Sequence, residues 1–303
     1  MRVAVTGTTG RVGAALANHL AAIYQVIPLP RAACDLADPM SLARALDTLD
    51  CEVFIHPAGL TSLEACEDDP ALARRLNAVA TGEIAAWAAR RGVRMIFIST
   101  DYVFDGLIPG LRIETDPTEP INGYGRSKLA GEAATLAHPG NLVLRISWVF
   151  GPEKPSFVDQ IFDAALAGRP LAAVADKYSL PTHTADLARW IHGLIDHRAS
   201  GILHACNPGE PVSWHGLATA VVAEMTACGL LRQRPEIAAR KLADMRAFRA
   251  LRPRFTAMDT QRLAAALGEE LRPWPQALTE YVRHRACPAT RVSGLAAHDG
   301  GKA

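Results

Sequence analysis

Short apolar runs alternate with longer amphipathic stretches along the first half of the chain. The apolar runs that indicate β-strands are Arg2–Val5, Gln25–Leu29, Glu52–Ile55, Arg94–Ser99 and Asn141–Ser147. Between them, apolar residues at helical spacing predict helices over Arg11–Ile23, Pro39–Leu49 and Pro70–Arg91. Strands that alternate with helices are joined by right-handed crossovers into a parallel sheet. We therefore predict an α/β fold with a Rossmann-type, doubly wound parallel sheet.

The pattern loosens after about Gly151, where longer connections separate the elements. The predicted elements there are helices at Ser156–Ala167, Thr184–His197, Ser213–Cys228, Asp259–Leu267 and Trp274–His284, and a short strand at Ile202–His204. We predict a first domain over residues 1–150, to which part of 182–206 returns. A smaller C-terminal lobe would consist of 151–181 and 207–287. Residues 288–303, rich in Gly, Ala and Ser, are expected to form a flexible tail.

Composition and charge narrow the class of protein. The 303 residues are 49% hydrophobic and 21% charged, which is typical of a soluble, enzyme-sized globular chain. The 32 Lys and Arg residues balance 31 Asp and Glu residues, so the formal charge of +1 gives no field that would attract nucleic acid or an anionic membrane. Because no signal-like segment and no long apolar run is present, we expect a cytoplasmic protein without nucleic-acid or membrane partners.

A glycine-rich turn joins the first predicted strand to the first predicted helix. It reads Thr6-Gly7-Thr8-Thr9-Gly10-Arg11-Val12-Gly13. Glycine is needed where the chain turns sharply and where backbone amides approach a pyrophosphate at a helix N-terminus. The position of the turn favours a dinucleotide site over a glycine-rich turn that binds nothing.

A second motif combines a hydroxyl, a tyrosine and a lysine. Thr100 ends the fourth predicted strand, and Tyr124 precedes Lys128 by four residues, so the two side chains share a helix face. The ordinary pKa of tyrosine is about 10, and a neighbouring ammonium lowers it toward the working pH of a proton donor. Without the other motifs, Tyr124 and Lys128 could equally be an amphipathic surface pair.

Together these motifs resemble the extended short-chain dehydrogenase/reductases, and within them the dTDP-4-dehydrorhamnose reductases. Further matching segments are Glu114–Pro120, Arg145–Gly151, Asp176–Thr182, Ser213-Trp214 and Arg252–Thr260. The resemblance extends from residue 1 to about residue 285. It implies that the first domain binds NAD(P) and that the lobe binds the substrate.

The resemblance also implies roles for individual residues. Tyr124 would be the general acid, Thr100 the hydroxyl that hydrogen-bonds the substrate carbonyl, and Lys128 the group that holds the nicotinamide ribose and lowers the tyrosine pKa. The residues expected at the substrate are Asp101, Tyr102, Trp148 and Arg252. The residues expected at the cofactor, besides Tyr124 and Lys128, are Gly7, Thr9, Gly10, Arg11, Val12, Gly13, Arg31, Asp35, Leu36, Ala58 and Gly59. Trp148 could instead be a core aromatic, and Arg252 a solvated surface residue.

Some positions depart from the family pattern. His56-Pro57 replaces an Asn-Ala type of strand end beside the cofactor, and a histidine there is more often structural than catalytic. Lys177 and Ser179 stand where relatives usually have Gln and Gly, so the sugar or nucleotide preference can differ. Some relatives bind magnesium through a glutamate at the position of Ala15, so we predict no metal. The cysteines, which lack metal-type spacing and favour reduced, mostly buried thiols, are Cys34, Cys51, Cys66, Cys206, Cys228 and Cys287.

The end of the second strand bears on the choice of cofactor. Sites specific for NAD usually place a carboxylate there, whereas this chain has Pro30 followed by Arg31. A guanidinium can bind the 2′-phosphate of NADP(H) through a planar fork, so NADP(H) is favoured, although NAD(H) could also be accepted. Asp35-Leu36 resembles the pair that borders the adenine.

The resemblance implies an NADPH-dependent reductase of a 4-keto-6-deoxy nucleotide sugar, most simply one that converts dTDP-4-dehydro-L-rhamnose to dTDP-L-rhamnose. One alternative is a reductase or epimerase of another nucleotide sugar or of a specialised-metabolite ketone. Another is a non-catalytic NADP-binding subunit similar to the regulatory β subunit of methionine adenosyltransferase. The expected partner is the small nucleotide-sugar substrate, and a homodimer is compatible with the sequence.

Overall fold

A six-stranded parallel sheet forms the centre of the molecule. The computed structural model describes residues 1–286, so Cys287 and the predicted tail 288–303 lie outside the described residues. From one edge to the other the strands are β10 (Gly201–His204), β5 (Leu142–Ile146), β4 (Arg94–Thr100), β3 (Val53–His56), β1 (Arg2–Thr6) and β2 (Gln25–Leu29). The chain leaves β1 toward β2 and crosses back to β3, so the order reverses between β1 and β3. Parallel pairing confirms the predicted Rossmann-type sheet.

Alternate residues of the central strands enter two different cores, because successive side chains of a strand point to opposite faces. In β1, Val3 and Val5 join one core and Ala4 the other. In β4, Ile96 and Ile98 likewise join the core of Val3 and Val5, whereas Met95 and Phe97 join the core of Ala4. A sheet covered on both faces needs these uninterrupted apolar strands.

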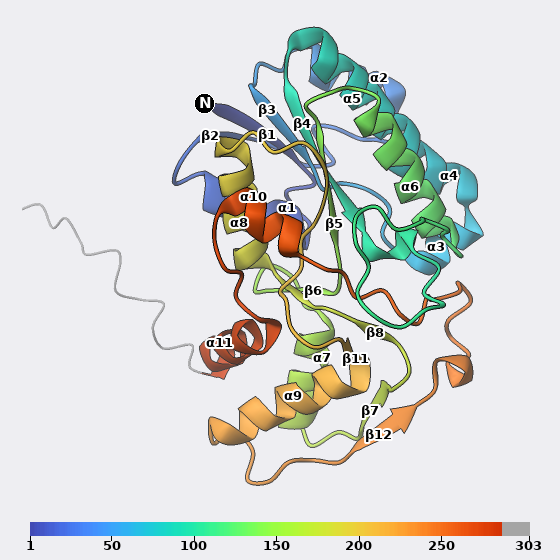
Figure 1. Ribbon diagram of the computed structural model, residues 1–303, viewed down its shortest axis with the longest axis vertical. Helices are drawn as coiled ribbons and strands as arrows, with labels where there is room; N and C mark the ends of the chain where they lie inside the picture. The colour runs from blue at the N-terminus through green and yellow to red at the C-terminus, as the bar shows by residue number, and fades with distance from the viewer. Residues whose placement is uncertain (287–303) are drawn as a thin grey trace, which may run out of the picture.

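Helices cover both faces of the sheet (Figure 1). One side carries α1 (Arg11–Leu20), α8 (Thr184–Asp196) and α10 (Gln261–Leu267). The other carries α2 (Pro39–Asp47), α5 (Ala80–Arg91) and α6 (Gly123–Leu136). Because the strands are parallel, the carboxyl ends of β1, β3, β4 and β5 lie at one edge of the sheet. Ligands bind at this edge in such folds.

The long helix predicted over Pro70–Arg91 is divided in the structure. It consists of α4 (Pro70–Arg74), a π-helical turn η1 (Arg75–Val79) and α5, and it is preceded by α3 (Leu63–Asp68). The π turn buries Asn77, which accepts from Leu60 N at 2.7 Å and donates to Leu60 O at 2.9 Å and to Ser127 Oγ at 2.9 Å. Helical periodicity could not reveal this interruption, because these partners are distant in sequence.

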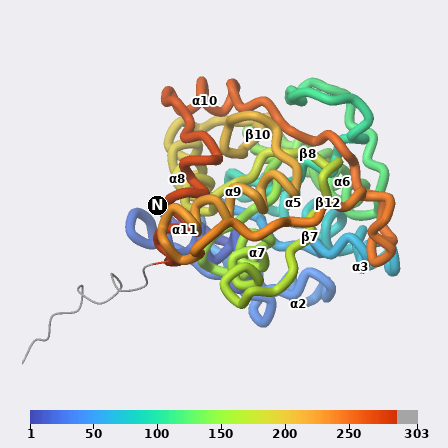
Figure 2. Tube along the Cα trace, turned by 90° about the horizontal axis from the view of Figure 1, so that it is seen from below, coloured from blue at the N-terminus to red at the C-terminus, as the bar shows by residue number. Residues whose placement is uncertain are grey.

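A second layer of structure lies beyond the carboxyl ends of the strands, in the lower half of Figure 1. Its helices α7 (Phe157–Leu166), α9 (Trp214–Ala227) and α11 (Trp274–Ala286) share one core, and α9 lies beside both α7 and α11 (Figure 2). The remaining elements are the strand pairs β7 (Leu171–Val174) with β12 (Ile237–Arg240), β8 (Tyr178–Ser179) with β11 (Val212–Ser213), and β6 (Val149–Phe150) with β9 (Thr182–His183), and the short turns η2 (Asp101–Val103) and η3 (Leu242–Asp244).

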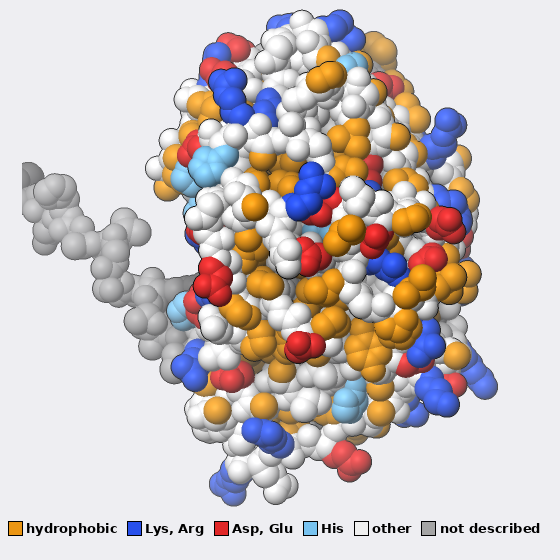
Figure 3. Space-filling view, in the orientation of Figure 1, with side chains coloured by type: hydrophobic (Ala, Val, Ile, Leu, Met, Phe, Trp, Pro, Cys, Tyr) orange, Lys and Arg blue, Asp and Glu red, His pale blue; other side chains and the backbone are white. Residues whose placement is uncertain are grey.

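The surface carries charges of both signs. On the face shown in Figure 3, Lys and Arg side chains are interspersed with Asp and Glu side chains, in keeping with the formal charge of +1. Within residues 1–286, no helix is both long enough and apolar enough to cross a membrane.

Candidate active site

One cavity of about 740 Å³ opens at the carboxyl edge of the main sheet. Its walls come from the turn after β1, the loops after β2 and β3, the end of β4, helix α6 and the end of β5. The predicted site residues that line it are Gly7, Thr9, Gly10, Arg11, Val12, Gly13, Arg31, Asp35, Leu36, Ala58, Gly59, Thr100, Asp101, Tyr102, Tyr124, Lys128 and Trp148. The fold therefore gathers into one place residues that are more than 140 positions apart in the sequence.

The glycine-rich turn forms one end of the cavity. Gly7 has a φ of 61°, a left-handed conformation that favours glycine. A Cβ on Gly13 would lie 2.2 Å from the carbonyl oxygen of Gly7, so a side chain there would push α1 away from the turn. The first turn of α1 has no acidic side chain, and its free amide groups face this end of the cavity. These features fit a site for the pyrophosphate of a dinucleotide.

The side chain of Arg11 crosses the mouth of this end of the cavity. Its Nε donates to Lys154 O at 3.0 Å, and its Nη2 donates to Pro155 O. Partial burial lowers the pKa of the guanidinium. In this structure Arg11 joins the first helix to the loop after β6, so its own contribution to a cofactor would come from the backbone.

The loop after β3 forms the opposite wall and is fixed by His56. The Nδ1 atom of the fully buried His56 lies 2.8 Å from Thr6 Oγ1, which also accepts from Ala58 N at 3.3 Å. Burial lowers the pKa of His56 to about 3, so the ring is neutral. His56 does not line the cavity, and its contacts tie the β1 and β3 ends together. These contacts give His56 a structural role.

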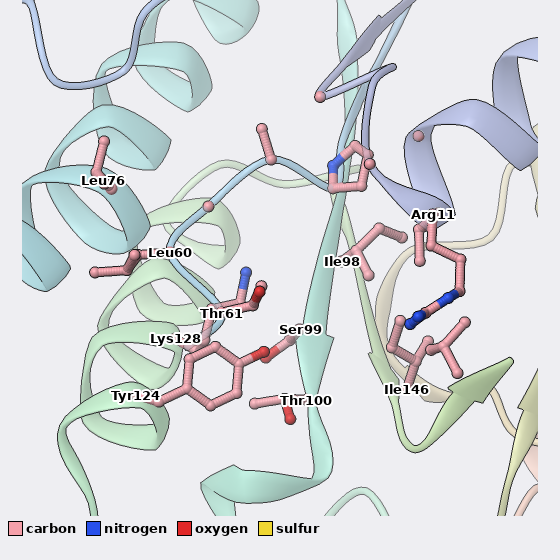
Figure 4. A pocket seen from close by; sticks show the side chains of 18 of the residues that line it. Arg11, Leu60, Thr61, Leu76, Ile98, Ser99, Thr100, Tyr124, Lys128 and Ile146 are labelled. Carbon is pink, nitrogen blue, oxygen red and sulfur yellow. The ribbon is translucent and has the colours of Figure 1, made fainter. Parts of the chain in front are cut away.

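Helix α6 positions Tyr124 against the end of β4. Asn122 caps the helix, with its Oδ1 accepting from Gly125 N at 2.7 Å. A Cβ on Gly125 would lie 2.2 Å from the carbonyl oxygen of Tyr102, so glycine lets α6 pack directly on η2. The Tyr124 hydroxyl consequently points across the cavity toward Ser99 and Thr100 (Figure 4).

Lys128 lies one turn further along α6 and is buried. Its Nζ atom is 3.9 Å from the centroid of the Phe97 ring. Burial lowers the pKa of Lys128 to about 7, with Glu132 opposing the shift. Glu132 itself is held by Arg145 at 2.7 Å in a buried ion pair. The amino group of Lys128 thus has a fixed position beside Tyr124 in the cavity wall (Figure 4).

The pKa of Tyr124 differs from the expectation. It lies above, not below, the usual value of a tyrosine, because burial raises it. The neighbouring Thr100 hydroxyl opposes that rise. The predicted lowering by Lys128 is therefore wrong for the chain alone, since both groups are removed from water and the lysine has itself become easier to deprotonate. A protonated Tyr124 is the form that a proton donor needs.

Asp101, Tyr102 and Trp148 form the other end of the cavity. The rings of Tyr102 and Tyr124 meet edge to face with centroids 5.9 Å apart. Trp148 packs against Trp214 at 5.7 Å and has a φ of 41°, which a bulky residue rarely adopts. Such backbone strain concentrates at functional sites, which favours a ligand-facing role for Trp148 over a purely core role.

Arg31 and Asp35 lie at the rim beyond the glycine-rich turn. The Arg31 side chain is 81% exposed, and its Nε is 3.4 Å from Asp35 Oδ2. Because it is exposed, the guanidinium can turn toward a phosphate that binds in the cavity. The Asp35 carboxylate would compete with that phosphate for the guanidinium.

Arg252 is the one predicted site residue that does not line the cavity. Its guanidinium pairs with Glu64 at 3.0 Å and stacks on Phe248 at 3.6 Å. With 7% of its side chain exposed, it is not the solvated surface arginine considered from the sequence, while its contact with substrate stays a prediction. Its contacts join α3 to the loop before α10.

Several residues of the site were missed by the sequence reasoning. Apolar or small side chains complete the cavity, namely Leu60, Thr61, Leu63, Leu76, Ile98, Ser99, Ile146 and Ser147. They carry no motif, because only the fold brings them together. Lys177 and Ser179 are fully buried directly behind Asp101, and the signal for them was their departure from the family pattern. Among residues 1–286, no cluster of three His, Cys, Asp or Glu side chains could hold a metal ion.

Comparison with known proteins agrees with this geometry. The family model "RmlD substrate binding domain" matches residues 1–287. A dTDP-4-dehydrorhamnose reductase of Mycolicibacterium smegmatis is 36% identical over 286 residues, covering 93% of this chain and 85% of that protein. One of Burkholderia thailandensis is 39% identical over 237 residues, covering 75% of this chain and 79% of that protein.

Solved structures are also similar. A dTDP-4-dehydrorhamnose reductase of Clostridium acetobutylicum superposes with a TM-score of 0.87 at 27% identity, covering 94% of this chain and 100% of that one. One of Bacillus anthracis, solved in complex with NADP, gives 0.84 at 26% identity, covering 93% of this chain and 99% of that one. The resemblance read from the motifs is confirmed: the chain belongs to the RmlD substrate binding domain family, as a dTDP-4-dehydrorhamnose reductase-like member of the extended short-chain dehydrogenase/reductases.

Proposed function

We propose that the protein is an NADPH-dependent reductase that converts the carbonyl of a 4-keto-6-deoxy nucleotide sugar to a hydroxyl, with dTDP-4-dehydro-L-rhamnose as the simplest substrate. The observation that carries the proposal is that Thr100, Tyr124 and Lys128 meet in the same cavity as the glycine-rich turn. A proton donor beside a dinucleotide site is what carbonyl reduction requires. The relatives of M. smegmatis and B. thailandensis bear the name of this activity.

The residues at the first end of the cavity fit NADP(H). The space at Gly7 and Gly13 that a Cβ would fill, together with the N-terminus of α1, would receive the pyrophosphate. Arg31 would meet the 2′-phosphate, with Asp35 and Leu36 beside the adenine. Lys128 would hold the nicotinamide ribose, and Ala58 and Gly59 would border it. When bound, the cofactor supplies the hydride for the carbonyl carbon.

Tyr124 would deliver the proton to the carbonyl oxygen. Burial keeps its hydroxyl protonated, so the proton is present when negative charge develops on that oxygen. Thr100, which ends β4 beside Tyr124, would offer a second hydrogen bond to the same oxygen. The carbonyl thereby gains one hydride and one proton and becomes an alcohol.

The opposite end of the cavity would hold the sugar. Trp148 and Tyr102 offer apolar ring surface to the sugar, and Asp101 contributes a polar group beside them. On this basis residues 1–150, with part of 182–206, would form the NAD(P)-binding domain, and residues 151–181 and 207–287 the substrate-binding lobe. In support, β10 pairs with β5 in the main sheet, while α7, α9 and α11 share a separate core. Helix α10 lies within 207–287 but departs from this division, because it packs against α8 and β10 on the main sheet.

The test is NADPH oxidation by the purified protein with 4-keto-6-deoxy sugars linked to dTDP, UDP or GDP, followed by identification of the product. Turnover that is fastest with the dTDP sugar supports the proposal, and turnover only with another nucleotide or ketone supports the alternative substrates. Tight NADPH binding without turnover of any carbonyl would favour a non-catalytic subunit. A homodimer, the absence of nucleic-acid partners and a cytoplasmic location stay predictions.

A further inference from the structure

A lysine is sealed behind the sugar end of the cavity. Lys177, just before β8, is fully buried and does not line the cavity. Its Nζ atom lies 5.0 Å from the ring centroid of Tyr102 and 5.4 Å from that of Trp148. The ammonium therefore lies against two aromatic rings that line the cavity, without lining the cavity itself.

A hydroxyl connects this lysine to Asp101. Lys177 Nζ donates to Thr256 Oγ1 at 3.4 Å, and Thr256 Oγ1 donates to Asp101 Oδ2 at 2.5 Å. Ser179 Oγ donates to the same carboxylate oxygen at 3.1 Å. Because a hydroxyl has one proton and Thr256 receives one from Lys177, its own proton is directed at Asp101.

The second oxygen of the carboxylate holds Thr100. Thr100 Oγ1 donates to Asp101 Oδ1 at 3.2 Å and accepts from Tyr102 N at 3.2 Å. An ionised Asp101 can accept from all three hydroxyls, and the Lys177 ammonium favours that form. To hydrogen-bond a substrate carbonyl, the single proton of Thr100 must turn away from Asp101.

Burial makes each charge depend on the other. Burial raises the pKa of Asp101, and Lys177 is the main group opposing that rise. Burial lowers the pKa of Lys177 to about 8, and Asp101 opposes that shift while Arg252 adds to it. Tyr102, Tyr124 and Cys206 are the other titratable groups close enough to feel Asp101, and burial raises the pKa of all three.

We propose that Lys177 is a positioning residue for the reduction: through Thr256 it balances the charge of Asp101, and thereby sets how readily the Thr100 hydroxyl turns to the substrate carbonyl. This inference rests on the proposed function. Without the ammonium, the ionised Asp101 holds the Thr100 proton more tightly. The second hydrogen bond to the carbonyl is then weakened, until at lower pH Asp101 takes up a proton of its own and releases that of Thr100.

The first test compares Lys177→Met and Lys177→Gln with the wild type. We expect kcat for the keto-sugar nucleotide to fall about 10-fold, which is less than the ~100-fold or larger loss on removing such a donor itself. The dissociation constant of NADPH should stay within about twofold, because the perturbation is at the other end of the cavity. On the acid side, the midpoint of the kcat/KM profile should rise by about 1–3 pH units, since Asp101 loses the nearby positive charge. The exposed Lys241→Met, which removes the same charge elsewhere, should match the wild type.

A second pair of variants tests the hydroxyl link with less risk to the fold. Thr256→Val keeps the shape of the buried side chain but removes the hydroxyl, and it should reproduce the acid-side shift. Thr256→Ser keeps the hydroxyl and should follow the wild-type profile. A profile for Thr256→Val that coincides with that of Thr256→Ser would overturn the proposal.

Intrinsic tryptophan fluorescence gives a readout that does not need turnover. The wild type should show a transition near pH 8 as Lys177 loses its proton close to Trp148, and the transition should be missing in Lys177→Met and Trp148→Phe. Folded Lys177 variants with wild-type kcat and pH profile would overturn the inference while leaving the proposed function intact. No turnover by the wild type would instead reject the proposed function.

Discussion

The preference for NADPH should depend on Arg31. A hydrogen bond to a charged group contributes about 1.5–3 kcal/mol where it is shielded from water. Arg31 is 81% exposed, and Asp35 lies 3.4 Å from its Nε, so solvent and the carboxylate both weaken its interaction with a phosphate. We therefore expect about 1–2 kcal/mol, which corresponds to roughly 5–30-fold in affinity.

Steady-state kinetics with both cofactors measure this effect. The wild type should have a lower KM for NADPH than for NADH, and Arg31→Ala should remove most of the difference while leaving NADH use nearly unchanged. Asp35→Asn should shift the ratio the opposite way, because a negative charge next to the phosphate is removed. Arg44→Ala, which removes an arginine that is 70% exposed and does not line the cavity, is the matched control.

Two results would refute the reasoning. A wild type that prefers NADH would show that the Pro30-Arg31 end of β2 does not select a phosphate. A preference for NADPH that survives in Arg31→Ala would assign the selection to other residues at that end of the cavity, such as Thr9 or Lys154.

Three further predictions follow from the geometry. Gly13→Ala should weaken NADPH binding at least 10-fold without loss of the sugar site, because its Cβ would lie 2.2 Å from Gly7 O; calorimetry with each ligand checks this, and unchanged NADPH affinity would contradict it. Trp148→Ala should weaken sugar-nucleotide binding by about 1–3 kcal/mol and NADPH binding much less; equal weakening of both would return Trp148 to the core. NADPH affinity of the wild type should fall as the pH rises through about 7, since the Lys128 ammonium then loses its proton. Lys128→Met should bind NADPH weakly and without this pH dependence. Parallel pH profiles of the two proteins would argue against a contact between Lys128 and the cofactor.

The sheet could be predicted from the sequence because its strands are continuously apolar and separated by amphipathic helices. The prediction for Gln25–Leu29 matches β2, and each end of the other main strands lies within one residue of its prediction. The π turn at Arg75–Val79 and the two-residue strands could not be predicted in this way, because they depend on contacts such as those of Asn77 with Leu60 and Ser127.

The site was predictable where a motif records a backbone requirement. Gly7 has a positive φ, and Gly13 lies so close to the carbonyl oxygen of Gly7 that a Cβ would not fit. Tyr124 and Lys128 share a helix face. The ion pair of Arg252 with Glu64 was not predictable, because the two residues are 188 positions apart in the sequence. The pKa of Tyr124 was misjudged for a related reason, since sequence spacing reveals a neighbouring charge but not the burial of both groups.

The most direct test of the account is the rate of reduction of dTDP-4-dehydro-L-rhamnose by NADPH in the wild type and in Tyr124→Phe. The variant keeps the ring and its packing against Tyr102 but has no proton to deliver. The account predicts turnover by the wild type and a loss of about 10²–10⁴-fold in kcat for Tyr124→Phe, with its fold and NADPH affinity retained. A Tyr124→Phe variant that keeps most of the wild-type kcat would contradict it.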